Sequence, residues 1–309
     1  MVILSSVPSS LPATDRTVVL GDLHGDREIF IGILMGSKCI IFENSQMTWT
    51  GGNTIVVCMG DTTDGRRPDT LDCDMEYEMK AMERELQIDI VELDKKARSS
   101  GGRVISILGN HDIYAGTKMY KDYSKPADNT SYPEGRTEAY KPGNSMAYIF
   151  GKTRNVVQIV GKYLFVHGSL VPEMLQILPG DNVTKRIEHM NRTMSSYLMG
   201  KTSMPRWFTD SSSEGVNPVE CRRYAEDHRR GEVKELLSYI PGVRLMVIGH
   251  TPCDHVSRKG SVICTDVALS RAFGHKRDVV VAEYLEINRE VPYRVKMYMN
   301  GRLKKTQLR

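Results

Sequence analysis

Five short apolar segments, each followed by a polar cluster, constrain the fold of this chain more than any other feature of its sequence. They lie at residues 18–20, 55–59, 104–108, 163–166 and 245–248, and a glycine stands within two residues after the end of each. Short apolar runs with such boundaries are typical of buried strands in a parallel sheet. Two further runs, 262–264 and 279–281, complete the predicted series of strands.

Helical periodicity appears between the strands. Apolar residues recur at every third or fourth position through Met75, Met79, Met82, Leu86, Ile90, Leu93 and Ala97, which predicts one long helix. A second helix is indicated by Val183, Ile187, Met190, Met194 and Leu198. Strands that alternate with helices favour an α/β fold built in layers. Two polar stretches, 114–145 and 199–232, are expected to be loops or caps over a site rather than separate domains.

The composition excludes several classes of protein. The chain has 309 residues, 40% of them hydrophobic, and a net charge of +4, which is ordinary for a globular protein and requires no nucleic-acid partner. The basic residues of the C-terminal tail, Arg302, Lys304, Lys305 and Arg309, are expected to be solvated. We find no apolar run of about 18 residues for a membrane span, no signal-peptide pattern and no Cys-x-x-Cys pair. We therefore expect a cytoplasmic protein.

The polar clusters share one position relative to the predicted strands, because each follows a strand directly. They are Gly-Asp-Leu-His-Gly at 21–25, Gly-Asp-Thr-Thr-Asp-Gly-Arg at 60–66, Gly-Asn-His-Asp at 109–112, His-Gly at 167–168 and Gly-His-Thr at 249–251. In α/β sheets, ligands bind outside the carboxyl ends of the strands. The five clusters are therefore expected to meet in one crevice, although they are far apart in the sequence.

The residue types in these clusters fit a pair of divalent metals. Asp22 and His24 are two residues apart, so an extended backbone directs both to one side. Asp61 is suited to bridge two metals about 3.5–4 Å apart. Carboxylate and imidazole ligands together favour manganese, iron or zinc over calcium or magnesium. Alone, Asp-x-His is more often a turn than a metal ligand, Gly-Asn-His-Asp is also compatible with a loop, and Gly-His-Thr is a weak signal. It is the ordered set of five that indicates a metal site.

The motifs resemble the calcineurin-like metallophosphoesterase superfamily, in particular its phosphoprotein phosphatase group. That group has GDxHG, GDxxDRG, GNHE, HGG and GHT, and this chain has GDLHG, GDTTDGR, GNHD, HGS and GHT. RTEAYKPG at 136–143 and LFVHGSLVPE at 164–173 also resemble the Shewanella-like protein phosphatases. The resemblance covers residues 16–287 and implies one catalytic domain. Its fold would be a four-layer α/β/β/α sandwich with the metal site at the carboxyl ends of the strands, followed by a C-terminal extension at 288–309.

The resemblance also implies a role for each site residue. The first metal would be held by Asp22, His24 and Asp61, and the second by Asp61, Asn110, His167 and His250. His111 would donate a proton to the leaving oxygen and Asp64 would orient it, since a histidine bonded to a carboxylate is held in one tautomer. The expected reaction is direct hydrolysis by a hydroxide that bridges the two metals.

The chain departs from the family pattern around the phosphate. Gly65 stands where the family has an arginine, and we expect Arg66 to reach the phosphate from a shifted loop. Further contacts with substrate are expected from Arg206, Arg222, Arg223 and Arg271. GNHD replaces GNHE, a variant that is more familiar among diadenosine tetraphosphatases.

These departures keep alternatives to a phosphoserine, phosphothreonine or phosphotyrosine protein phosphatase open. One is a hydrolase of diadenosine polyphosphates or another nucleotide pyrophosphate. Another is a phosphoesterase fold that serves as a non-catalytic scaffold, although all six ligands and His111 are present. A nuclease is less favoured, because the chain has no aromatic and basic stripe for single strands.

Overall fold

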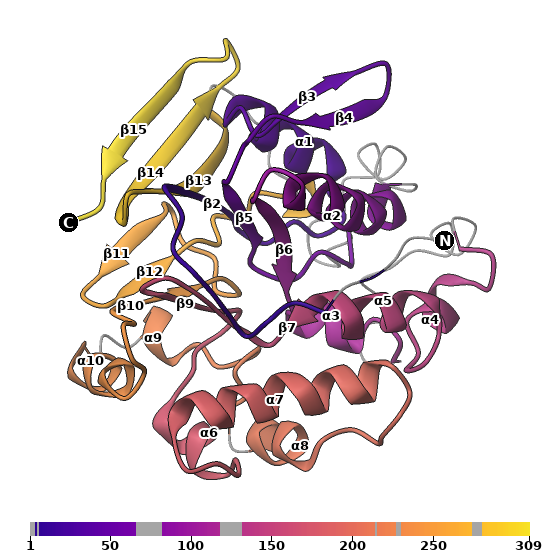
Figure 1. The fold of residues 1–309 in the computed structure, drawn as a ribbon, viewed down its shortest axis with the longest axis vertical. Coiled ribbons are helices and arrows are strands. Elements are labelled where there is room, and N and C mark those ends of the chain that lie inside the picture. The colour runs from indigo at the N-terminus through magenta and orange to yellow at the C-terminus, as the bar shows by residue number, and fades with distance from the viewer. Residues whose placement is uncertain are drawn as a thin grey trace.

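The computed structural model describes residue 4 and residues 6–65, 82–117, 132–213, 215–226, 230–273 and 280–309. Two mixed sheets form its centre (Figure 1). The larger has the order β15-β14-β13-β2-β5-β6-β7, and the smaller has the order β1-β8-β9-β10-β12-β11. A separate hairpin of β3 (Ile40–Glu43) and β4 (Gln46–Trp49) lies outside both sheets.

The larger sheet joins a parallel half to an antiparallel half. The parallel strands are β2 (Arg16–Leu20), β5 (Ile55–Cys58), β6 (Arg103–Ile107) and β7 (Arg154–Asn155). The antiparallel strands are β13 (Val280–Asn288), β14 (Val291–Tyr298) and β15 (Leu303–Gln307). Residues 288–309, expected as an extension, thus add strands to this sheet.

The smaller sheet carries the other two strands that lead to predicted ligands. These are β9 (Tyr163–Val166) and β10 (Leu245–Ile248), which pair in parallel at its centre. The remaining strands are β1 (Ser10–Leu11), β8 (Val157–Val160), β11 (Ser257–Lys259) and β12 (Val262–Cys264). All seven predicted strands are confirmed for their described residues.

Alternation along the strands divides the core into layers. Val19 and Val57 of the larger sheet pack with Phe165 and Val247 of the smaller one in a cluster between the sheets. The neighbouring Val18 and Val56 point to the opposite face of the larger sheet. There they pack with α1 (Arg27–Gly36) and α2 (Met82–Arg98). Because successive side chains of a strand point to opposite faces, each sheet is covered on both sides. The predicted four-layer α/β/β/α sandwich is confirmed.

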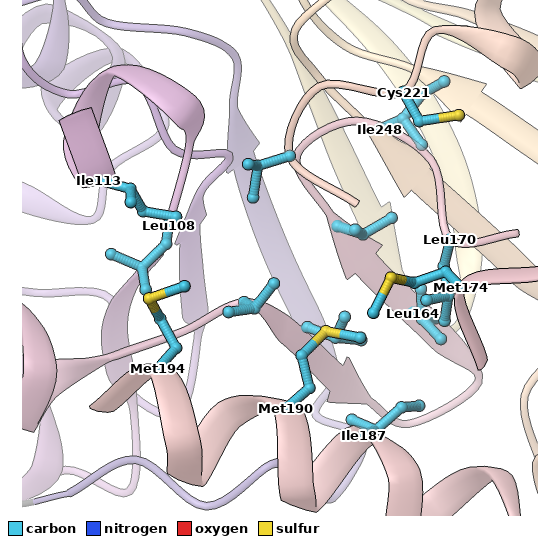
Figure 2. Packing of buried hydrophobic residues seen from close by; sticks show 14 of the residues in the cluster. Leu108, Ile113, Leu164, Leu170, Met174, Ile187, Met190, Met194, Cys221 and Ile248 are labelled. Carbon is cyan, nitrogen blue, oxygen red and sulfur yellow. The ribbon is translucent and has the colours of Figure 1, made fainter. Parts of the chain in front are cut away.

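Helix α7 (Val183–Leu198) covers the outer face of the smaller sheet. On its predicted apolar face, Ile187 and Met190 lie near Leu164 of β9, and Met194 lies near Leu108, which follows the end of β6 (Figure 2). The helix begins after Asn182, whose side chain accepts a hydrogen bond from the amide of Lys185. A side-chain acceptor at this position satisfies an amide that the helix itself leaves unpaired. The other predicted helix is confirmed from Met82 onward, and Met75 and Met79 lie outside the described residues.

The remaining helices are short, and α3 to α10 contribute residues to the same hydrophobic cluster as α7. They are α3 (Asn110–Tyr114), α4 (Arg136–Ala139), α5 (Ser145–Thr153), α6 (Pro172–Gln176), α8 (Arg206–Ser213), α9 (Arg223–Glu226), α10 (Arg230–Ser238) and the 3₁₀ turn η5 (Arg271–Phe273). The stretch 199–232 therefore contains helices. In the part of the chain that the structure describes, none of the helices has the length and apolarity needed to cross a membrane.

Candidate active site

The six predicted metal ligands come together where the parallel strands end. Asp22, Asp61 and Asn110 follow β2, β5 and β6 of the larger sheet, while His167 and His250 follow β9 and β10 of the smaller sheet. The site thus lies where the carboxyl ends of strands from both sheets meet. Asp22, Asp61 and His167 are at most 2% exposed.

The ligand atoms form two groups that share Asp61. In each group the possible ligand atoms lie within 4.8 Å of one another, and the groups are Asp22, His24, Asp61 and Asp61, His167, His250. Asn110 joins the second group, because its Oδ1 lies 3.1 Å from Nε2 of His167. Two adjacent groups around one shared carboxylate are the arrangement expected for a pair of metals.

Backbone carbonyl groups turn two of the histidines toward the cluster. Nδ1 of His24 lies 3.1 Å from the carbonyl oxygen of Thr63, and Nδ1 of His167 lies 2.7 Å from that of Met59. In a neutral imidazole ring, a nitrogen that donates to a carbonyl leaves the other, Nε2, without a proton, and this is the form of histidine that binds metals. The environment of each ring therefore suits a ligand.

The charge of the cluster also fits bound cations. Burial alone would lower the pKa of His167, but the carboxylates of Asp61 and Asp22 raise it to about 10. The buried carboxylates thus stabilise positive charge at the centre of the site. Divalent metals would supply that charge, so the donor set and its electrostatics agree.

The backbone is strained at these positions. His24, Asp61, Asp64 and His250 have φ values of 41°, 44°, 62° and 61°, a region that costs a non-glycine residue about 1–3 kcal/mol. Hydrogen bonds hold these conformations, since the amide of His24 donates to the carbonyl of Asp61 at 2.8 Å. The amide of His250 donates to Oδ2 of Asp22 at 3.1 Å. The strain directs the side chains into the site.

The predicted proton donor lies directly beside the cluster. His111 is the second residue of α3, and its amide donates to Oδ1 of Asp61 at 2.9 Å. Its Nδ1 lies 2.8 Å from Oδ2 of Asp64, and its Nε2 lies 4.0 Å from Oδ2 of Asp61. The ring is therefore held on one side by a carboxylate and presents the other nitrogen to the ligands.

Comparison with protein families agrees with this geometry. The family model of the calcineurin-like phosphoesterases matches residues 15–254, which include all six ligands. The chain is a calcineurin-like phosphoesterase. Like the family, it is a hydrolase that acts on phosphoester bonds.

Individual relatives of this phosphoesterase include protein phosphatases. It is 25% identical to Shewanella-like protein phosphatase 2 of Arabidopsis thaliana over 334 aligned positions, which cover 91% of this chain and 77% of that protein. An uncharacterized protein of Schizosaccharomyces pombe is 28% identical over 277 positions, 84% of this chain and 75% of that one. The crystal structure of a cold-active protein-tyrosine phosphatase from a psychrophilic Shewanella species has a TM-score of 0.70 at 18% identity, covering 97% and 83%, and supports the fold.

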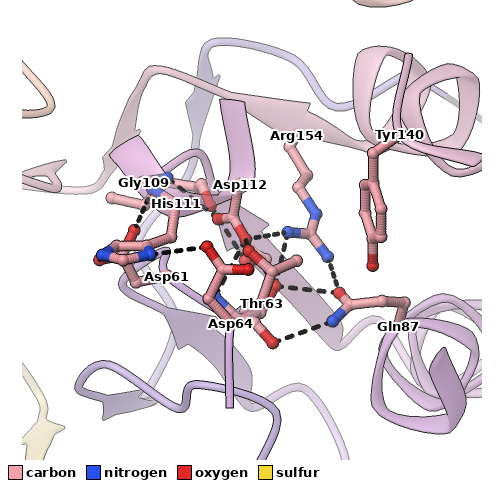
Figure 3. A network of polar contacts seen from close by, with 12 residues as sticks. Asp61, Thr63, Asp64, Gln87, Gly109, His111, Asp112, Tyr140 and Arg154 are labelled. Carbon is pink, nitrogen blue, oxygen red and sulfur yellow. Dashed lines mark hydrogen bonds and ion pairs between the residues drawn. The ribbon is translucent and has the colours of Figure 1, made fainter. Parts of the chain in front are cut away.

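Asp112 stands within a network of polar contacts beside the site of this phosphoesterase (Figure 3). One oxygen accepts the amide of Thr62 at 3.0 Å and the other accepts the amide of Gly109 at 3.0 Å. Arg154 of β7 lies 3.4 Å from the first oxygen. Because Asp112 binds the backbone just after Asp61 and just before Asn110 and is 2% exposed, it shapes the site without facing the substrate. The sequence shows that Asp112 replaces the glutamate of the family's GNHE motif, but it gave no indication of this structural role.

Sequence reasoning also missed Glu83 and Arg136. Both are buried, and both contact Asp64, the partner of His111. Arg136 stands in the RTEAYKPG stretch, which was the only sequence signal for it. Glu83 lies at the start of α2 among other charged residues and had no signal.

The arginines predicted to bind substrate have different surroundings. Arg66 lies outside the described residues. Arg222 is exposed, and its Nη1 lies 3.4 Å from the carbonyl oxygen of the ligand His250. Arg206 is exposed at the start of α8. The other two carry ion pairs, Arg223 with Glu173 and Glu232 and Arg271 with Asp26 and Glu28. Among the predicted substrate-binding arginines, Arg222 therefore contacts the predicted metal ligand His250.

Proposed function

We propose that this phosphoesterase is a protein phosphatase that hydrolyses phosphate monoesters on serine, threonine or tyrosine side chains in a single step. The observation that carries the proposal is the position of His111, between Asp64 and the shared carboxylate Asp61. The similarity to Shewanella-like protein phosphatase 2 over 91% of the chain supports the same substrate class.

The ligand cluster would hold two divalent metals, of which manganese, iron and zinc suit its carboxylate and imidazole donors. The first would be held by Asp22, His24 and Asp61, and the second by Asp61, Asn110, His167 and His250. Bound there, the metals would supply Lewis acidity toward the phosphoryl group and a water of lowered pKa.

His111 would protonate the leaving oxygen from Nε2. Its Nδ1 is bonded to Asp64, which fixes the ring and leaves Nε2 on the side of the ligands. An alkoxide or phenoxide is a strongly basic leaving group, and a positioned acid accelerates its departure by about 10²–10⁴-fold. Arg222 would attract the phosphate from the rim, where its exposed guanidinium lies next to His250.

The main competing function is hydrolysis of diadenosine polyphosphates, which the GNHD motif had kept open. In the structure the aspartate of that motif, Asp112, is buried and bonded to Thr62 and Gly109. A residue in this position does not contact a substrate. The motif therefore gives the nucleotide function no direct support.

A substrate panel tests the proposal. Purified protein with added Mn²⁺ should release phosphate from phosphoserine, phosphothreonine or phosphotyrosine peptides faster than it cleaves diadenosine tetraphosphate, and EDTA should abolish both activities. Preferred cleavage of the dinucleotide would replace the proposal with its rival. Protein that binds no metal and turns over neither substrate would instead be a scaffold.

A further inference from the structure

The carboxylate that holds His111 has a second partner deep in the protein. Oδ1 of Asp64 accepts a hydrogen bond from Nη2 of Arg136 at 2.5 Å, while Oδ2 faces Nδ1 of His111 at 2.8 Å. The side chain of Arg136 is 3% exposed and that of Asp64 is fully buried. Asp64 thus lies between the candidate proton donor and a buried guanidinium.

Glu83 fixes Arg136 from the other side. Nε and Nη2 of Arg136 lie 2.9 and 3.0 Å from the two oxygens of Glu83, which also accepts the amide of Asp64 at 2.7 Å and the hydroxyl of Tyr132 at 2.7 Å. Burial would raise the pKa of Glu83, but Arg136 and these hydrogen bonds hold it below its ordinary value. Glu83 and Arg136 therefore form a buried charged pair in the folded protein.

The geometry points to Arg136, held by Glu83, as a positioning residue for catalysis: it fixes Asp64 and, through Asp64, the proton-donating orientation of His111. This inference rests on the proposed function, in which His111 is the general acid. Arg136 does not bind phosphate in this arrangement, because its side chain is buried and bonded to two carboxylates.

The planar fork of an arginine is what this position requires. One guanidinium contacts both Asp64 and Glu83, which a lysine ammonium on a flexible stem does not reproduce. Without the fork, one oxygen of Asp64 loses its partner and the carboxylate is free to turn. A displacement of about 1 Å in a catalytic group costs up to roughly 10²-fold in rate.

The leaving group provides the test, because only a basic leaving group needs the proton. Mn²⁺-loaded Arg136→Lys should lose about 10- to 100-fold in kcat with phenyl phosphate. With 2,4-dinitrophenyl phosphate, whose leaving group is weakly basic, kcat should change by less than about threefold and KM should stay unchanged. Glu83→Gln, which keeps the size of the side chain, should show the same split, a loss of kcat with phenyl phosphate but not with 2,4-dinitrophenyl phosphate. It replaces Arg136→Lys in the test if the lysine variant does not fold.

Two further variants make the result specific. Arg154→Lys alters another buried arginine, one that contacts Thr62 and Gln87 but not Asp64, and it should affect both substrates equally. The double variant His111→Asn/Arg136→Lys should be no slower with phenyl phosphate than His111→Asn alone, since both changes act on one proton transfer.

The outcomes distinguish the positioning role of Arg136 from the proposed role of His111 as general acid. If His111→Asn slows both substrates equally, His111 is not the acid and the proposed mechanism fails. If His111→Asn shows the split but neither Arg136→Lys nor Glu83→Gln does, His111 remains the acid and the positioning role of Arg136 is wrong. Additive losses in the double variant would also overturn that role.

Discussion

Gly109 faces Asp61 so closely that a Cβ atom on Gly109 would overlap both the backbone nitrogen and the carboxylate oxygen Oδ1 of Asp61. The same relationship recurs across the site, since a Cβ on Gly249 would lie 2.6 Å from Oδ1 of Asp22. Each glycine is the residue just before a ligand. These glycines therefore let neighbouring strand ends approach until their ligands share one cluster.

We expect Gly109→Ala to displace Asp61 and to lower kcat/KM by roughly 10²-fold, since small shifts in a catalytic site have effects of that size. Activity and bound metal, measured on the same preparation, check this. Gly231→Ala is the matched control, because a Cβ at Gly231 meets nothing within 4 Å. Equal activity of the two variants would contradict the close approach at Gly109.

We expect Asp64→Asn to lower kcat by about 10²-fold with substrates that have basic leaving groups. An asparagine carries an oxygen and an NH₂ group where Asp64 has two acceptors. If its oxygen faces His111, its NH₂ meets the guanidinium of Arg136, and in the flipped orientation it meets Nδ1 of His111. Steady-state kinetics with phenyl phosphate tests the expectation, and wild-type rates in a folded variant would refute it.

Metal removal should stop the reaction and destabilise the fold. A ligand at 100 times its Kd stabilises the native state by about 2.7 kcal/mol, so adding Mn²⁺ to EDTA-treated protein should raise its melting temperature. Asp61→Asn weakens both groups of ligands at once and should lose this increase together with activity. The same increase in wild type and variant would remove Asp61 from the metal site.

The sequence allowed most of the candidate metal cluster to be located, because its signals are local. A ligand such as Asp22 follows an apolar strand by one or two residues, and parallel strands bring their carboxyl ends to one edge. The fold follows from the same pattern. Strand β14 gave no such signal, because only two of its eight residues are buried and polar side chains interrupt its apolar ones.

The contacts beneath the site could not be predicted in this way. Arg136 lies 72 residues from Asp64, and Arg154 lies 92 residues from the hydroxyl of Thr62 that it binds. Neither arginine belongs to a metal-binding motif, and a single sequence does not distinguish a buried arginine from a solvated one. Their roles depend on which elements pack together, and only the tertiary structure reveals that.

Glu286 should make the stability of the larger sheet depend on pH. It joins β13 to the adjacent strand β2 through Arg16 at 3.2 Å, and to β15, which lies beyond β14, through Lys305 at 2.5 Å. Burial raises its pKa, but the hydrogen bond from Lys305 and the charge of Arg16 outweigh burial and lower the pKa below the ordinary 4.5. A lowered pKa in the folded state means that the stabilisation is complete above pH 4.5 and is lost as the pH falls through the folded value.

We therefore expect Glu286→Gln to lower the free energy of unfolding by about 1 kcal/mol at neutral pH, with the difference shrinking toward zero in acid. Urea unfolding of both proteins across this range, with EDTA present so that metal binding does not contribute, measures the difference. Glu188→Gln, which removes an exposed ion pair with Lys185, should change little at any pH, since such pairs contribute little. A Glu286 difference that stays constant with pH would mean that its charge has no part in holding β13 to β2 and β15.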